Sequence, residues 1–168
     1  PEIRQYYHRF FSSTRRTREE TAWIHETREL MKDHLYEFIN EFKIDLIVPQ
    51  NVLSFPQHIS LSMAIAEVIA ETKIPTIAHH HDFVWERERF MVNAVDDYIL
   101  AAFPPHLSEI QVPTLVIAAE QDGLTPAAEA LEWSKLIPGS RYVEIPGAGR
   151  CVHSYHQLGN VGDIVVLD

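Results

Sequence analysis

The chain is poor in cysteine, in long apolar runs and, over its first two-thirds, in glycine. Cys151 is the only cysteine, so no disulfide can form within the chain, and this favours a cytoplasmic protein. No apolar run approaches the ~20 residues that a membrane-spanning helix needs. Apolar residues make up 46% and charged residues 23% of the 168 residues, which is typical of a single globular domain.

The missing glycines exclude two kinds of nucleotide site. Gly123 is the first of the 6 glycines, whereas a Gly-x-Gly-x-x-Gly loop or a P-loop needs backbone without Cβ close to phosphate. The sequence before Gly123 therefore holds neither loop, and no cofactor is predicted. The formal charge is −10, and the basic cluster of Arg15, Arg16 and Arg18 is too short for a nucleic-acid-binding face.

Short apolar runs alternate with segments of helical periodicity. Thr17 and Glu20 have the spacing of a capping box before one such helix, and Pro56, Asp82 and Pro126 mark the starts of others. This alternation predicts a single domain over residues 1–168, a three-layer Rossmann-like α/β fold with a parallel sheet of about five strands flanked by helices. The expected strands are 44–48, 76–79, 114–118, 141–145 and 164–167.

The strongest local feature is the run His79, His80, His81 and Asp82, where the second expected strand ends and a helix begins. Ligands of parallel α/β sheets bind at the carboxyl ends of strands, and imidazoles can hydrogen-bond sugar hydroxyls or pair with phosphate. The plainer alternative is that these histidines point to the core and to solvent while Asp82 caps the helix. A zinc site on His79 and His81, completed by Asp82 or His58, ranks last, and no metal is predicted.

Polar residues of the loop after the first expected strand would lie at the same edge of the sheet. Gln50 and Asn51 carry amides suited to sugar hydroxyls, although turn chemistry also explains them. Arg87 is near enough to the next helix start to reach a phosphate, although a solvated charged face is the plainer reading. The predicted catalytic residues are His79, His81 and Asp82, and the predicted substrate-binding residues are Gln50, Asn51, His58, His80 and Arg87.

Several ordered segments within residues 1–111 resemble glycosyltransferase family four, a GT-B type family. The matching segments are 35–39, 44–51, 79–83, 85–90 and 102–105. They are similar to the later half of that family's N-terminal Rossmann-like domain, where the stretch matching His79 to Asp82 lines the acceptor cleft. The resemblance implies retaining transfer between a nucleotide sugar and a sugar acceptor. The family's Gly-rich loop and C-terminal donor domain are absent here, so we expect no transfer by this chain alone.

From residue 112 the sequence resembles the last third of an α/β-hydrolase. The matching segments are 112–117, 121–122, 125–126, 137–141 and 145–149. In that family the Asp matching Asp122 orients the catalytic His, but this chain has Arg150 at the histidine position, and arginine is not a general base at neutral pH. The nucleophile elbow Gly-x-Ser-x-Gly is also missing from the sequence. Two alternatives to the transferase interpretation therefore stay open: a non-catalytic chimeric α/β scaffold, and a hydrolase relative without its elbow.

Overall fold

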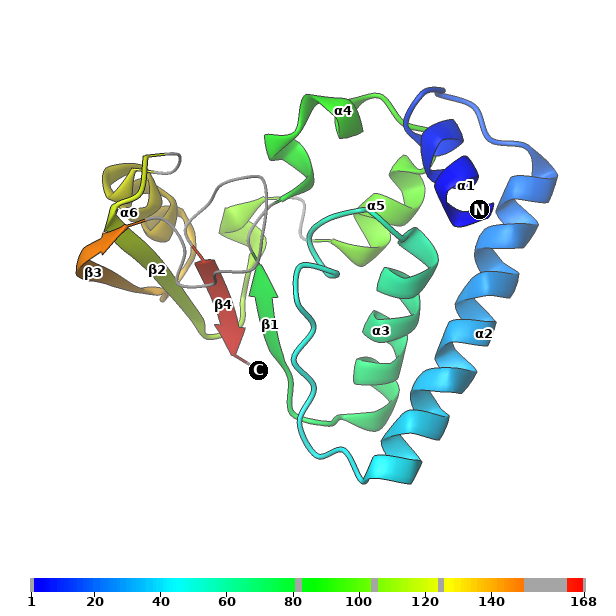
Figure 1. Cartoon of the computed structure of the whole chain (residues 1–168), viewed down its shortest axis with the longest axis horizontal. Coiled ribbons are helices and arrows are strands. Elements are labelled where there is room, and N and C mark those ends of the chain that lie inside the picture. Colours follow the sequence, from blue (N-terminus) through cyan, green and yellow to red (C-terminus); the bar gives the residue numbers. More distant parts are fainter. Residues whose placement is uncertain (1, 81–82, 104–105, 124–125, 150–162, 168) are drawn as a thin grey trace.

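A computed structural model describes residues 2–80, 83–103, 106–123, 126–149 and 163–167 (Figure 1). Its elements follow one another as α1 (Glu2–Phe10), α2 (Arg18–Phe42), α3 (Ile59–Thr72), β1 (Ile77–His80), η1 (Val84–Glu86), α4 (Glu88–Met91), α5 (Asp96–Ala102), η2 (Leu107–Glu109), β2 (Thr114–Gln121), α6 (Ala127–Leu136), β3 (Arg141–Gly149) and β4 (Asp163–Leu167). The fold is of the α/β class.

The sheet has four strands in the order β1-β4-β2-β3. β2 and β3 are parallel, whereas β4 is antiparallel to both of its neighbours, β1 and β2. β1, β2 and β3 therefore run in one direction, and β4 alone runs against them. The expectation of about five parallel strands is wrong in number, and the last expected strand is reversed.

The first expected strand, 44–48, is the one that does not form as a named strand. Two isolated parallel bridges connect this part of the chain to the β1 region: Ile47 pairs with Thr76, which precedes β1, and Gln50 pairs with His79 in β1. Ile47 N donates to Pro75 O at 3.0 Å and Asn51 N donates to His79 O at 2.6 Å. Pro49 lies between these donors and has no N–H, so the ladder is interrupted at its centre.

The helices α1, α2, α3 and α5 share one hydrophobic core. Its buried members are Phe10, Ile24, Ile59, Val95, Tyr98, Ile99 and Phe103. The predicted capping box fixes the start of α2, because Glu20 N donates to Thr17 Oγ1 at 3.2 Å and Thr17 N donates to Glu20 Oε2 at 2.7 Å. The buried Glu20 is also paired with Arg9 Nε at 2.7 Å, which ties α1 to α2.

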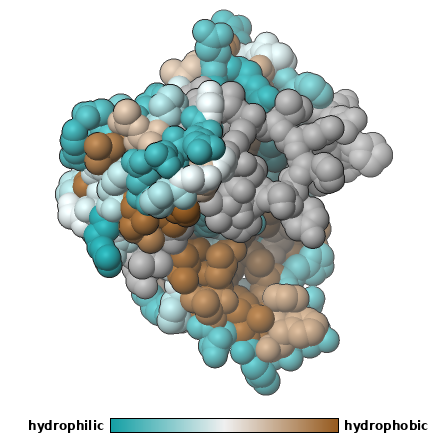
Figure 2. All heavy atoms as spheres, turned by 60° about the vertical axis from the view of Figure 1, so that its left-hand side comes forward, coloured by the Kyte–Doolittle hydropathy of each residue, from teal (hydrophilic) through white to brown (hydrophobic). Residues whose placement is uncertain are grey.

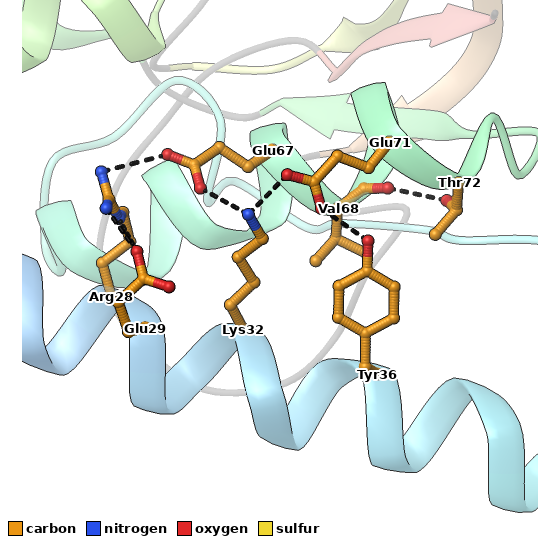
Figure 3. A network of polar contacts seen from close by, with 8 residues as sticks. All are labelled: Arg28, Glu29, Lys32, Tyr36, Glu67, Val68, Glu71 and Thr72. Carbon is orange, nitrogen blue, oxygen red and sulfur yellow. Dashed lines mark hydrogen bonds and ion pairs between the residues drawn. The ribbon is translucent and has the colours of Figure 1, made fainter.

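A row of charged groups joins α2 to α3 (Figure 3). Lys32 Nζ lies 3.0 Å from Glu67 Oε2 and 2.5 Å from Glu71 Oε1, while Arg28 reaches Glu67 at 3.2 Å. Tyr36 donates to Glu71 at 2.5 Å. The hydrogen bonds to Glu71 and Glu67 raise the pKa of Lys32 above its ordinary value. The row forms because its residues are one helical turn apart on each helix, Arg28, Lys32 and Tyr36 on α2 and Glu67 and Glu71 on α3, and the two helices run in the same direction.

A second core lies between α6 and the sheet. Its buried members are Phe83, Ile110, Val116, Ala118, Ala130 and Ile137. α6 packs on β2 and β3. Apolar atoms gather mainly in the lower middle of the view in Figure 2. The exposed large apolar side chains of α6 and β3 are Leu131, Leu136 and Val143.

The helix expected after Asp82 is broken into short pieces: η1, α4 and α5. Asn93 explains the break between α4 and α5, because its Nδ2 donates to Phe90 O at 2.9 Å and its Oδ1 accepts from Val95 N at 2.8 Å. Asparagine side chains compete in this way with helical backbone bonds. None of the described helices is long and apolar enough to cross a membrane.

Two helices end at a lysine in a part of the sequence that contains no glycine. Lys43 and Lys73 follow α2 and α3 in the left-handed conformation, with φ of 54° and 56°. Glycine is the usual residue there, since a Cβ costs energy in this conformation.

We predict that Lys73→Gly raises the free energy of unfolding by ~1 kcal/mol, because it removes the Cβ strain. Lys73→Ala is the control, since it removes the same exposed ammonium but keeps the Cβ. Urea unfolding measures both variants, and an equal gain in the alanine variant would contradict the explanation.

Candidate functional site

The polar residues around the carboxyl end of β1 come together through backbone pairing. The parallel bridge sets Gln50 beside His79, and His79 N donates to Pro49 O at 3.0 Å. Asn51 adopts a left-handed backbone with φ of 59°, and its Oδ1 accepts a 3.2 Å hydrogen bond from Ser54 Oγ. Backbone pairing thus places Gln50 and Asn51 next to His79 at the end of β1, and their predicted part in substrate binding stays a prediction.

Alternation along β1 sends its two histidines to opposite faces of the sheet. His80 is 4% exposed, and its ring centroid lies 5.6 Å from that of Phe83 in the core beneath α6. His79 is half-buried on the other face. His81 and Asp82 lie outside the described residues, so their predicted roles stay predictions.

Arg87 is not on β1 or on the loop before it, but follows η1 in the sequence. It directly precedes the short helix α4, with extended backbone, and its side chain is half-buried. Its predicted contact with phosphate stays a prediction. Within the described ranges, no three His, Cys, Asp or Glu side chains are grouped closely enough to hold a metal ion.

His58 has a structural role that the sequence did not reveal. It is the N-cap of α3, and its Nδ1 accepts a 3.2 Å hydrogen bond from Leu61 N. Its ring is nearly parallel to that of Trp23, with centroids 6.3 Å apart. Its Nε2 is buried and has no hydrogen-bond partner within the part of the chain that the structure describes. Burial lowers the pKa of His58 below its ordinary value, since desolvation disfavours the charged ring.

Asp122 directly follows β2, whose carboxyl end faces the same side of the sheet as that of β1 but extends beyond it. Through β4, His80 is level with Val116, since both pair with Ile164. Asp122 lies six residues farther along the chain, about 20 Å away at the rise of a strand. His79 and His80 are therefore well separated from Asp122 along the strand direction.

Glu120 was not singled out from the sequence but joins the ends of β2 and β3. Its Oε2 accepts a 2.6 Å hydrogen bond from Gly147 N, and Gly147 has a positive φ of 68°. Gly149 is the Cα partner of Gln121, so the Gly-Ala-Gly stretch lies along the end of β2, and Asp122 directly after it is half-buried. Arg150, which follows that stretch, lies outside the described residues.

Comparison with known families agrees with the layered strands and helices. The family model of the alpha/beta hydrolase fold matches residues 19–157. The chain belongs to the alpha/beta hydrolase fold family. The match begins far upstream of residue 112, so the likeness to this family is not limited to the tail.

Two curated proteins match part of the sequence. A mannosylglucosylglycerate synthase of Petrotoga mobilis is 34% identical over 77 residues, which are 44% of this chain and 17% of that protein. The enzyme of the same name from Thermotoga maritima is 25% identical over 126 residues, 73% of this chain and 28% of the relative. The matched part is thus less than a third of each relative. No solved structure matches the chain.

The buried cap predicts a pH dependence specific to His58. As pH falls below ~6.5, an unfolded His58 takes up a proton while the folded ring, with its lowered pKa, stays neutral. The stability that neutral His58 contributes is fully present above pH ~6.5. It falls as the pH is lowered from that value to the pKa of the folded protein, and does not change further below it. Over this range the free energy of unfolding falls by a fraction of ~1.4 kcal/mol per pH unit, because solvent screens the partly exposed ring.

The measurement compares urea unfolding of the wild type and His58→Asn between pH 7 and pH 5. Asparagine keeps a capping oxygen but does not titrate. We expect the wild type to lose more stability on acidification than the variant; parallel pH profiles would contradict the assignment.

Proposed function

We propose that this chain is the acceptor-side half of a nucleotide-sugar-dependent glycosyltransferase and binds a sugar acceptor at the carboxyl end of β1. The observation that carries the proposal is the pairing of Gln50 with His79, which sets an amide side chain beside an imidazole. The names of the two relatives support the sugar chemistry. The chain matches only part of those enzymes, so the proposal assigns donor binding to a region beyond the matched part.

The proposed site recognises hydroxyl groups rather than strong charge. The amides of Gln50 and Asn51 each offer donors and an acceptor, so paired hydrogen bonds to neighbouring hydroxyls are available. His79 is the group proposed to orient the reacting hydroxyl. His81 and Asp82, the other predicted catalytic residues, follow it two and three positions later in the sequence. His80, buried next to Phe83, would fix the end of β1 rather than contact the sugar.

The leaving group needs a separate partner. A departing nucleotide diphosphate is anionic, and Arg87 is the residue we propose to meet it when the acceptor is in place. The predicted part of His58 in substrate binding stays a prediction, because its Nδ1 already caps α3. Transfer by this chain alone is not part of the proposal.

A hydrolase function is the second candidate, favoured by the family match and by Asp122 at the end of β2. The sequence has no Gly-x-Ser-x-Gly elbow, and the histidine position is occupied by Arg150. The histidines at β1 are too far along the sheet to replace it. A non-catalytic α/β scaffold is the outcome if neither ligand binding nor hydrolysis is found.

We predict that glucosylglycerate, chosen from the relatives' names, stabilises the chain against heat. At a concentration ~100 times its Kd, the gain in unfolding free energy is ~2.7 kcal/mol. Gln50→Ala should weaken binding about fivefold to tenfold, since it removes one hydrogen-bonding side chain. Thermal unfolding with a ligand titration measures both effects.

Gln111→Ala is the matched control, because Gln111 is an exposed glutamine away from β1. Equal affinity in the Gln50 and Gln111 variants would contradict the site. Hydrolysis of a nitrophenyl ester that is lost on Asp122→Ala, without any response to sugars, would favour the hydrolase instead.

A further inference from the structure

One face of the sheet stays open to solvent where the chain after α2 runs beside β1 (Figure 1). Residues 76–80 alternate strictly between a buried and a half-buried side chain, and in residues 46–50 the even-numbered side chains are exposed. Successive side chains of an extended chain point to opposite faces. One face of this paired region is therefore packed in the interior, and the other carries the exposed and half-buried side chains.

The open face changes from apolar to polar along its length. The bridges of Ile47 with Thr76 and of Gln50 with His79 have the same register, so the pairing between them is continuous. The open face thus carries three cross-strand pairs: Leu46 with Pro75, Val48 with Ile77, and Gln50 with His79. Leu46 and Val48 are 45% and 56% exposed. Two apolar pairs therefore continue from the polar pair of the proposed sugar site, each step being about 7 Å at the rise of a strand.

We propose that this face binds an amphiphilic sugar acceptor, whose hydroxylated head lies at Gln50 and His79 and whose apolar chain lies over Val48 and Ile77. Covering the exposed apolar pairs removes hydrophobic surface from water on both molecules. Neither segment, 46–50 or 75–79, contains Lys, Arg, Asp or Glu, so the apolar chain lies against no formal charge from these two segments. The inference rests on the proposed acceptor site and adds the class of acceptor that the site takes.

Methyl glucoside and octyl glucoside test the apolar part of the ligand, because they share the sugar and differ only in the length of the alkyl chain. The glucose head is chosen from the relatives' names. Isothermal titration calorimetry of the whole chain, at concentrations below micelle formation, should show that octyl glucoside binds at least about tenfold more tightly. Equal affinities would overturn this inference but leave the proposed sugar site standing, whereas no binding of either compound would contradict both.

Substitutions at the two ends of the face separate the head from the chain of the ligand. Gln50→Ala should weaken the binding of both glucosides by about the same factor, because both lose a hydrogen bond to the shared sugar. A loss for octyl glucoside that is absent for methyl glucoside would contradict the placement of the head at Gln50.

Val48→Ser should lower the affinity for octyl glucoside at least about fivefold, because it removes apolar surface beneath the chain. Val92→Ser is the matched control, since Val92 is 58% exposed and follows α4, outside this face. Equal octyl glucoside affinity in the Val48 and Val92 variants would overturn the proposal. If Val48→Ser fails to fold, the comparison of the two glucosides on the wild type still decides the matter.

Discussion

The pairing of β4 with two strands at once holds the sheet together. Val166 is the Cα partner of both Ala78 in β1 and Thr114 in β2. The two hydrophobic cores share no buried residue, one being formed by α1, α2, α3 and α5 and the other by α6 and its strands. β4 therefore joins, through backbone hydrogen bonds, two parts that each bury their own apolar side chains.

This arrangement decides which functional residues can cooperate. Since β1 and β2 are separated by β4 and offset along their length, the histidines and Asp122 lie at different levels of one sheet. Residues that pair directly, such as Gln50 with His79, are brought together instead. A site at the end of β1, as proposed, would therefore lie apart from Asp122 in the same sheet.

Much of the local structure followed from the sequence. Apolar runs located β1, β2, β3 and β4, and the Thr17–Glu20 spacing located the start of α2. The reversed direction of β4 could not be predicted, because side-chain periodicity is the same for either strand direction. The effect of Pro49 was visible in principle, since a proline at the end of an expected strand removes a ladder donor.

The candidate site was predicted less completely. Adjacent strand ends were enough to group Gln50, Asn51 and His79. The capping role of His58 and its contact with Trp23 were not predictable, because they depend on how α2 packs against the start of α3. The helix expected after Asp82 would include Asn93, but the side chain of Asn93 bonds to backbone groups and separates α4 from α5.

The central claim is that β4 lies between β1 and β2, and inter-strand NOEs of Val166 test it most directly. The account predicts NOEs from Val166 to both Ala78 and Thr114. NOEs between β2 and β3 with none from Val166 to Ala78 would contradict it, since β1 would then belong to a separate unit.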